Sequence, residues 1–333
     1  MQIPKLLTLL PEEYAVTPDG MEIDRYGNLI LACPNFADMS KPSCICMIDK
    51  NLNVRKWFDV PLSERTHEAR AMGLAFGPDW DLYIVDNQGW SKEPALSCQG
   101  RILRVRMDGD IIEKVTVVAE GMEHPNGIRI KGSYVYVTQS TMASAKTKSG
   151  NLVSGVYRFH LDDENIHINN TLEDPNLFIS FETKNPADQY GVDGIVFDQE
   201  GNLYVGNFGD GEVFKIQFDE NGNIQSNVLF AKDPEKLRST DGMTVDQNGN
   251  IYVADFVVNA IAKIDKKGNV TRIAQSPDSD GLQGELDQPG EPCVWEGKIV
   301  VSCFDCVVGG DKWNTEHELP ATMSVLEVPG AEL

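Results

Sequence analysis

Residues 192–205 read VDGIVFDQEGNLYV, and residues 240–253 read TDGMTVDQNGNIYV. In both stretches an Asp-Gly pair leads into an apolar run, a polar turn follows, and a second run of β-branched and aromatic residues comes after the turn. Apolar runs of this length joined by Gly and Asn turns predict antiparallel β-hairpins.

The same pattern recurs six times along the chain at a spacing of roughly 50 residues, which is typical of the blades of a β-propeller. A third and a fourth strand are expected after each of the first five hairpins: 43–48 and 54–60, 100–107 and 111–119, 155–161 and 176–181, 212–218 and 227–231, and 260–265 and 270–274. The sequence therefore predicts an all-β fold.

The sixth repeat lacks a fourth strand. Its hairpin is expected in 291–294 and 297–304 and its third strand in 322–328, but no strand follows. The N-terminal stretch 3–10 has no partner of its own and would supply the missing strand, which removes an exposed sheet edge. We therefore expect a six-bladed β-propeller closed by its N-terminal strand, with residues 1–333 forming one domain.

One column of the repeat is polar. The residue before the glycine, or its equivalent in the sixth copy, differs from blade to blade and is taken by Asp19, Met72, Asn126, Asp193, Asp241 and Glu291. The first strand of each blade starts near the central axis, so these positions should converge. Side-chain oxygens without Cys or His suit a hard divalent cation, with Ca²⁺ preferred and Mg²⁺, Mn²⁺ or Zn²⁺ left open.

A simpler interpretation is that these Asp-Gly and Asn-Gly pairs are turns. However, turns between strands are already provided by Asp24, Asp198 and Asp246 with the glycines that follow them. The pre-glycine residues stand ahead of apolar strands instead. Their repetition in separate blades favours a ligand set over turns.

Asp-Gly before an apolar strand in consecutive repeats, together with Pro125-Asn126-Gly127-Ile128, resembles the SMP-30/gluconolactonase/LRE-like family of regucalcin-type lactonases. The resemblance extends over essentially the whole chain. It implies a six-bladed propeller with one catalytic divalent cation, held here by Asp19, Asn126, Asp193 and Asp241. Asp19 stands where the family usually has Glu, and Asp193 stands where an amide is common.

The resemblance and the oxygen ligands together predict a divalent-metal-dependent hydrolase. The first expectation is a lactonase that opens a sugar lactone or a related small cyclic ester, with Asp241 as general base or nucleophile. The alternatives are a phosphotriester or aryl ester hydrolase on the same scaffold, and a non-catalytic propeller that binds a ligand or a protein.

Four residues beside the ligand set are additional candidates for the metal site or the pocket. Glu291 is a further oxygen ligand, His124 a proton carrier, Asn87 a pocket residue and Met72 an apolar wall. His67 is a second candidate for proton transfer. For both histidines, an ordinary loop residue is the alternative.

The composition disfavours nucleic acid and membranes as partners, and we expect a small-molecule substrate. A net charge of −22 and a pI near 4.5 disfavour nucleic acid and anionic membranes. No apolar run approaches the ~20 residues needed to cross a bilayer, and the first ten residues do not look like a signal peptide. We expect a cytoplasmic protein, with a mature secreted form and the oligomeric state left open. Seven cysteines are expected to be mostly buried, reduced thiols.

Overall fold

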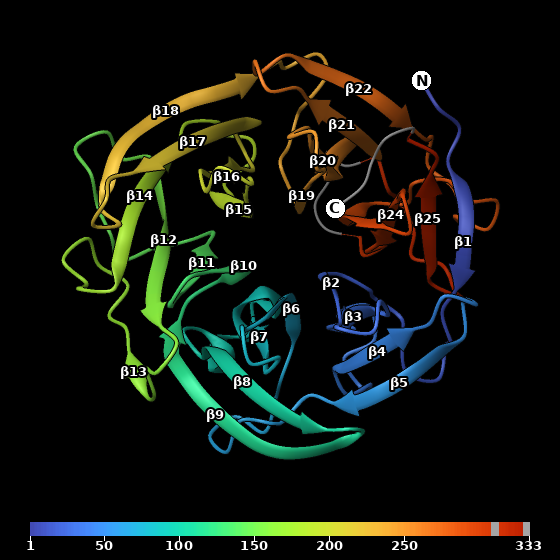
Figure 1. Cartoon of the computed structure of the whole chain (residues 1–333), viewed down its shortest axis with the longest axis horizontal. Helices are drawn as coiled ribbons and strands as arrows, with labels where there is room; N and C mark the ends of the chain where they lie inside the picture. Colours follow the sequence, from blue (N-terminus) through green and yellow to red (C-terminus); the bar gives the residue numbers. More distant parts are fainter. Residues whose placement is uncertain (308–312, 329–333) are drawn as a thin grey trace. The chain divides into compact units, whose positions relative to one another are not determined.

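The computed structural model describes residues 1–307 and 313–328. Their strands form six sheets, each with four antiparallel strands, taken in order along the chain (Figure 1), and this confirms the all-β, six-bladed β-propeller class. Helical structure in the described ranges is confined to three short 3₁₀ helices: η1 (Gln88–Ser91), η2 (Pro94–Leu96) and η3 (Phe256–Val258). In the same ranges no helix is long and apolar enough to cross a bilayer.

The chain divides into two compact units. The internal unit, residues 20–192, contains the first three blades. The strands of the first blade are β2 (Met21–Ile23), β3 (Leu29–Cys33), β4 (Cys44–Ile48) and β5 (Val54–Asp59); of the second, β6 (Ala71–Phe76), β7 (Leu82–Asp86), β8 (Gly100–Asp108) and β9 (Ile111–Met122); of the third, β10 (Pro125–Lys131), β11 (Tyr134–Gln139), β12 (Leu152–His160) and β14 (Leu177–Thr183).

The terminal unit, residues 1–19 and 193–333, contains the other three blades. The strands of the fourth blade are β15 (Val192–Phe197), β16 (Leu203–Asn207), β17 (Glu212–Phe218) and β18 (Ile224–Lys232); of the fifth, β19 (Met243–Val245), β20 (Ile251–Asp255), β21 (Ala260–Ile264) and β22 (Val270–Gln275); of the sixth, β23 (Pro289–Trp295), β24 (Lys298–Cys303), β25 (Thr322–Leu326) and β1 (Lys5–Leu9).

The N-terminal strand completes the sixth blade as predicted. β1 pairs antiparallel with β25, with Lys5 opposite Val325 and Leu9 opposite Thr322 (Figure 1). The boundaries of most other strands agree with the sequence to within a few residues, although β18 begins at Ile224 instead of Asn227. One strand was not predicted: the two-residue β13 (Ile166–His167) adds to the outer strand β9 in parallel orientation.

Asp and Asn side chains fix the turns between strands. In the turn after β15, Asp198 Oδ1 accepts the backbone N–H of Asn202 at 2.8 Å, and Asp198 Oδ2 accepts the side-chain amide of Asn202 at 2.8 Å. Asp246 and Asn250 repeat this arrangement after β19 at 2.8 Å for both bonds. These aspartates therefore act as turn residues, as the sequence predicted.

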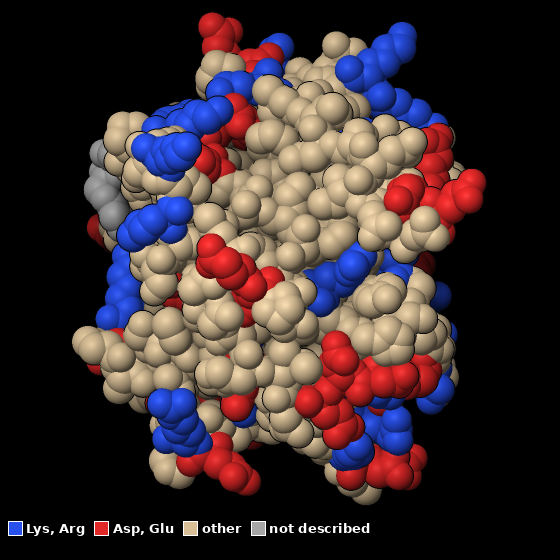
Figure 2. All heavy atoms as spheres, turned by 90° about the vertical axis from the view of Figure 1, so that its left-hand side faces the viewer, with Lys and Arg blue, Asp and Glu red and all other residues tan. Residues whose placement is uncertain are grey.

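The core is built from the alternating apolar faces of neighbouring blades. In the internal unit Ile30 and Ile45 of the first blade pack with Leu74 and Ile84 of the second. In the terminal unit Val213 of the fourth blade packs with Val253 of the fifth. On the face in Figure 2, Lys and Arg stand in small groups beside Asp and Glu, around a broad area of uncharged residues. This face presents no extended basic surface.

Candidate active site

Four carboxylates of the predicted column come together in the terminal unit. Asp19 is the last residue before the chain enters the first blade, Asp193 is the second residue of β15, Asp241 lies two residues before β19, and Glu291 is the third residue of β23. Asp19, Asp193 and Glu291 are each no more than 7% exposed. Asp241 is partly exposed. Part of the Asp241 residue thus reaches solvent, although its carboxyl group is buried.

Glycine lets these segments approach closely. A Cβ atom on Gly194 would lie 2.1 Å from the carbonyl oxygen of Asp241, and one on Gly290 would lie 2.8 Å from Asp19 Oδ1. A Cβ on Gly242 would lie 2.7 Å from the Cβ of Glu291. These distances are too short for any side chain. The glycine beside each carboxylate therefore makes room for the carboxylate segment of a neighbouring blade.

The carboxylates shift the protonation of Asp241. Burial raises the pKa of Asp241 well above its ordinary value of 3.8, and the charges of Asp193, Asp19 and Glu291 raise this pKa further, in that order. The backbone N–H of Gly242, 3.0 Å from Asp241 Oδ1, opposes this shift. A nearby positive charge would stabilise the ionised form of the Asp241 carboxyl group.

The donor set fits a hard divalent cation. All four side chains offer carboxylate oxygens, the ligands that Ca²⁺ prefers, and they approach from three blades and the segment that enters the first. No thiol or imidazole belongs to the group. In donor type, Asp19, Asp193, Asp241 and Glu291 therefore match the oxygen ligands of a hard divalent cation.

Met72 and Asn126 occupy the equivalent positions in the internal unit. A Cβ on Gly73 would lie 2.4 Å from the carbonyl oxygen of Asn126, so the same close approach occurs here. Asn126 is 7% exposed and Met72 is 3% exposed. The backbone N–H of Gly127 donates to the Thr138 hydroxyl at 2.7 Å, which ties the start of β10 to β11.

His124 is buried and neutral at physiological pH. Burial lowers its pKa from 6.5 to about 4. Asn87 Oδ1 accepts the backbone N–H of Trp90 at 3.0 Å, so the amide nitrogen of Asn87 faces His124 Nδ1 at 3.1 Å. Nδ1 is then an acceptor and Nε2 carries the proton. This Nε2–H is buried without a hydrogen-bond partner in the described part of the chain.

Side chains at the ends of second strands hold the loops that carry the predicted site residues. Asp255, the last residue of β20, accepts the backbone N–H of Ser239 at 2.9 Å and of Arg238 at 2.9 Å. Gln139, the last residue of β11, likewise accepts the backbone N–H of Glu123 at 2.8 Å. The N–H groups that they accept belong to residues two or three positions before Asp241 and Asn126. No such role was predicted for Asp255 and Gln139 from the sequence. Their signal was a polar residue ending an otherwise apolar strand.

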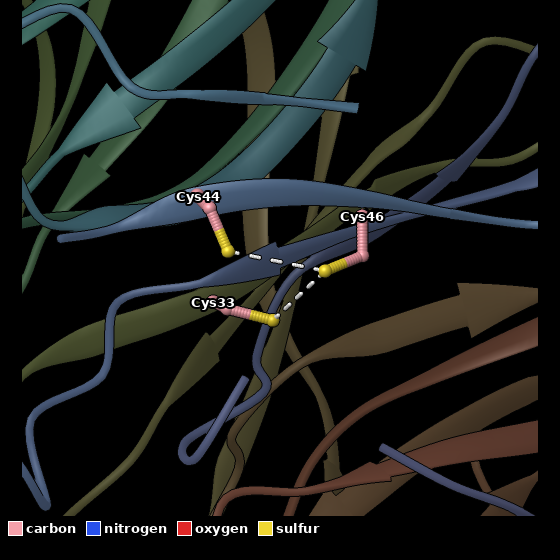
Figure 3. A group of neighbouring side chains, drawn as sticks. All are labelled: Cys33, Cys44 and Cys46. Carbon is pink, nitrogen blue, oxygen red and sulfur yellow. Dashed lines mark hydrogen bonds between the residues drawn. The ribbon is translucent and has the colours of Figure 1, made fainter. Parts of the chain in front are cut away.

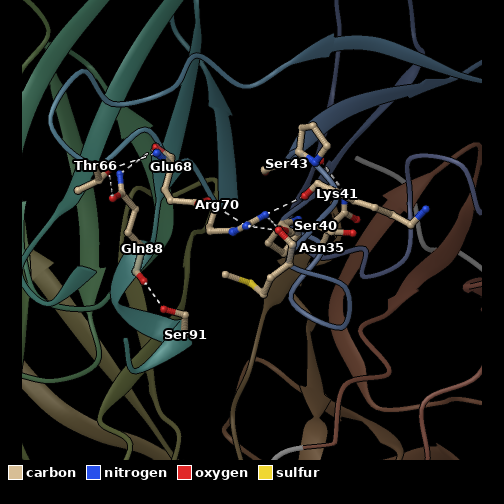
Figure 4. Close-up of polar contacts among 12 residues, drawn as sticks. Asn35, Ser40, Lys41, Ser43, Thr66, Glu68, Arg70, Gln88 and Ser91 are labelled. Atoms are coloured by element: carbon tan, nitrogen blue, oxygen red, sulfur yellow. Dashed lines mark hydrogen bonds and ion pairs between the residues drawn. The ribbon is translucent and has the colours of Figure 1, made fainter. Parts of the chain in front are cut away.

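Arg70 fixes the loop ahead of Met72 in another way (Figure 4). Its guanidinium is 2% exposed and donates to the carbonyl oxygens of Lys41 and Met39, both at 3.0 Å, in the loop between β3 and β4. It also pairs with Glu68 Oε2 at 2.9 Å. His67, the second predicted proton carrier, is exposed. Arg70 therefore joins the first two blades, whereas His67 stands at the surface.

Aromatic side chains follow the second strands of the terminal unit. Phe208 and Phe256 have ring centroids 5.8 Å apart, and Phe256 and Phe304 are also 5.8 Å apart, in edge-to-face contact. Asp305, next to Phe304, lies in a second acidic group with Asp287 and Glu318. Burial and these neighbouring charges raise the pKa of Asp287 to about 9.

The comparisons with known proteins agree with this architecture. The family model described as "SMP-30/Gluconolactonase/LRE-like region" matches residues 53–231 and 210–280, which is more than half of the chain. No curated protein is matched by the chain.

Solved structures similar to this one include a luciferin-regenerating enzyme, a regucalcin and a gluconolactonase. A luciferin-regenerating enzyme aligns with a TM-score of 0.64 at 12% identity, covering 99% of both chains. A calcium-binding regucalcin from Agrobacterium tumefaciens aligns with a TM-score of 0.62 at 12% identity, covering 99% of this chain and 95% of the other. A gluconolactonase from Xanthomonas campestris aligns with a TM-score of 0.58 at 14% identity, covering 98% and 95%.

At these sequence identities the structural similarity supports only a shared fold, and family membership is supported by the matched family model. The chain belongs to the SMP-30/gluconolactonase/LRE-like family.

Proposed function

We propose that the protein is a divalent-metal-dependent lactonase that opens a sugar lactone or a similar small cyclic ester. The observation that supports this most directly is the convergence of Asp19, Asp193, Asp241 and Glu291 in the terminal unit, all with oxygen ligands. Membership of a family that includes gluconolactonases supports the lactone as substrate.

Asp19, Asp193 and Asp241 are the proposed protein ligands, with Asn126 added because it fills the same repeat position in the third blade. Glu291 is an additional candidate ligand. When bound, a divalent cation such as Ca²⁺ would supply Lewis-acid polarisation of the lactone carbonyl. It would also lower the pKa of Asp241 from its raised value, because an opposite charge favours the ionised carboxylate.

Asp241 is the proposed catalytic residue because it lies among the other three carboxylates, whose charges act on it together. As a carboxylate it would either remove a proton from an attacking water or attack the carbonyl carbon itself. His124 is proposed as a hydrogen-bond donor to the substrate through its Nε2–H. Its lowered pKa makes it unsuited to carry a proton at pH 7.

The test is proton release from a panel of aldonolactones after treatment of the protein with chelator, with Ca²⁺, Mg²⁺, Mn²⁺ or Zn²⁺ added back. We expect metal-dependent hydrolysis that Asp241→Ala abolishes. Glu235→Gln is the matched control, since it removes an exposed carboxylate from the same blade connection. It should leave the rate unchanged.

Two outcomes would favour the alternatives. Hydrolysis of aryl phosphotriesters without any lactonase activity would indicate the ester hydrolase. Absence of metal binding, with no hydrolysis of either substrate class, would indicate a non-catalytic propeller.

A further inference from the structure

Three cysteines of the first blade lie together on one face of its sheet (Figure 3). Cys44 and Cys46 are two residues apart on β4, which places both side chains on the same face, and Cys33 on β3 is directly opposite Cys44. Cys46 Sγ lies 3.8 Å from Cys33 Sγ and 3.9 Å from Cys44 Sγ. All three sulfur atoms are within 4.8 Å of one another.

This spacing matches that of sulfur ligands around one metal ion. Thiolates bound tetrahedrally to zinc at about 2.3 Å from the metal are separated from each other by about 3.8 Å. Soft thiolate ligands select d¹⁰ cations such as Zn²⁺ and Cu⁺ over Ca²⁺ or Mg²⁺. We propose that Cys33, Cys44 and Cys46 bind one soft d¹⁰ cation, Zn²⁺ or Cu⁺, in the first blade.

The surroundings of the three sulfurs support this assignment. All three side chains are 0% exposed, so a bound ion would be protected from competing solvent ligands. Lys56 on β5 stands opposite Cys46 in the register of the sheet, which places a positive charge near the thiols.

The remaining cysteines lack these features. Cys303 and Cys306 have the spacing of a metal-binding pair, yet among the described residues no third thiol, imidazole or carboxylate is grouped with them, and Cys303 Sγ contacts the Ser324 hydroxyl at 3.4 Å. Cys98 is partly exposed and lies outside the cluster. Cys98 therefore provides a control that leaves the three thiols intact.

The proposed soft site is chemically separate from the proposed calcium site. Its ligands are sulfur and not oxygen, and no residue is shared between the two groups. A chain that binds zinc through its cysteines but hydrolyses no lactone would keep this inference and refute the proposed function. A chain that hydrolyses lactones but binds no metal through its cysteines would keep the proposed function and refute this inference.

The experiment measures metal content in the full-length chain. The protein is produced in medium supplemented with zinc or, in a second arm, with copper, purified under a thiol-free reductant, and analysed by elemental mass spectrometry. We expect one equivalent of the metal per chain in the wild type and in Cys98→Ser. In Cys44→Ser and in the Cys33→Ser/Cys46→Ser double variant, the metal content per chain should fall roughly tenfold or more below that of the wild type.

Cobalt substitution provides a second readout that needs no variant. Co²⁺ bound by thiolates gives an intense sulfur-to-metal charge-transfer band in the near ultraviolet. The wild-type spectrum therefore tests the proposal even where a serine variant does not fold. Wild-type protein without zinc, copper or this band would overturn the proposal. Metal retained undiminished in folded cysteine variants would overturn it as well.

Discussion

Asp241 and His124 show two ways in which burial shifts a titratable side chain. Asp241 is crowded by other carboxylates, so the folded protein favours its protonated form. His124 is buried beside the neutral amide of Asn87, so the folded protein favours the uncharged imidazole. Both shifts predict how stability changes with pH, and in opposite directions.

Asp241→Asn is expected to stabilise the metal-free protein. The folded pKa of Asp241 lies above its ordinary value of 3.8, so its stabilising effect is complete below pH 3.8 and is lost as the pH rises through the folded pKa. The amide removes this loss. At pH 7 in chelator we expect a gain of about 1–2 kcal/mol in the free energy of unfolding, measured by urea denaturation.

The gain should vanish at pH 4, where the wild-type carboxyl is protonated. Glu235→Gln should show no gain at either pH. A variant that is less stable than wild type at pH 7 in chelator would show that Asp241 is not repelled by its neighbours.

His124 is expected to destabilise the fold in acid. Its pKa is about 4 in the folded protein against an ordinary value of 6.5, so the contribution is complete above pH 6.5 and is lost as the pH falls toward 4. This difference corresponds to about 3 kcal/mol. Histidine NMR signals should include one that does not titrate between pH 8 and 5 and that disappears in His124→Gln.

The loss of stability between pH 6.5 and 4 should be smaller in His124→Gln than in wild type. His67→Gln is the matched control because His67 is exposed, and it should retain the wild-type pH dependence. A His124 signal with a midpoint near 6.5 would contradict the buried, neutral imidazole.

At the scale of strands and loops, the polar residue that ends a second strand holds the loop ahead of the site. Asp255 accepts the N–H groups of Arg238 and Ser239 and lies 3.3 Å from the Arg272 guanidinium. These bonds are made two and three residues before Asp241. Asp255 is therefore a positioning residue, since it acts on the site through the backbone.

Asp255→Ala is expected to weaken Ca²⁺ binding roughly tenfold or more, because the backbone ahead of Asp241 loses its anchor. Isothermal titration with Ca²⁺ measures this effect. Removal of the buried carboxylate also leaves Arg272 without its ion-pair partner and should cost about 3 kcal/mol of stability.

Two further variants separate positioning from a general loss of stability. Asp255→Asn keeps one oxygen to accept the Ser239 N–H, so it should recover part of the affinity. Asp265→Ala removes a partly exposed turn carboxylate from the same blade and should leave Ca²⁺ affinity unchanged. Equal affinity in all three variants and wild type would refute the positioning role.

The repeat in the sequence was sufficient to predict the strands and the carboxylate column, because both depend on local patterns that recur in every blade. The anchor at Asp255 was not predicted, since it depends on which backbone N–H groups meet the end of β20. The grouping of Cys33 with Cys44 was missed for a similar reason. It follows from the register between β3 and β4, which composition and spacing alone do not define.

At the scale of the whole molecule, the sixth blade depends on residues from both ends of the sequence. β1 provides the partner for β25, and Gln2 N–H also donates to the carbonyl oxygen of Ile273 at 2.6 Å. Without β1, the outer edge of β25 would be an unpaired strand. Such edges promote association with other chains.

Deletion of residues 1–10 is expected to lower the melting temperature by about 4 °C or more, since a loss of 2 kcal/mol shifts a chain of this size by roughly that amount. The truncated protein should also associate through β25, which size-exclusion chromatography would detect. A flexible extension added before Met1 serves as the control and should alter neither property. A truncated protein that melts like wild type would show that β1 contributes little to the blade.

The prediction that residues 1–333 form one domain concerns how the two units unfold, and we propose that they unfold together. Trp57, Trp80 and Trp90 belong to the internal unit, whereas Trp295 and Trp313 belong to the terminal unit. Incorporation of 5-fluorotryptophan places a ¹⁹F NMR signal at each of these positions, assigned by single Trp→Phe variants. In a urea titration, the folded signals of Trp57 and Trp295 should disappear at the same midpoint. A folded Trp57 signal that persists after the Trp295 signal is lost would indicate two domains, because the internal unit would then be stable without the terminal unit.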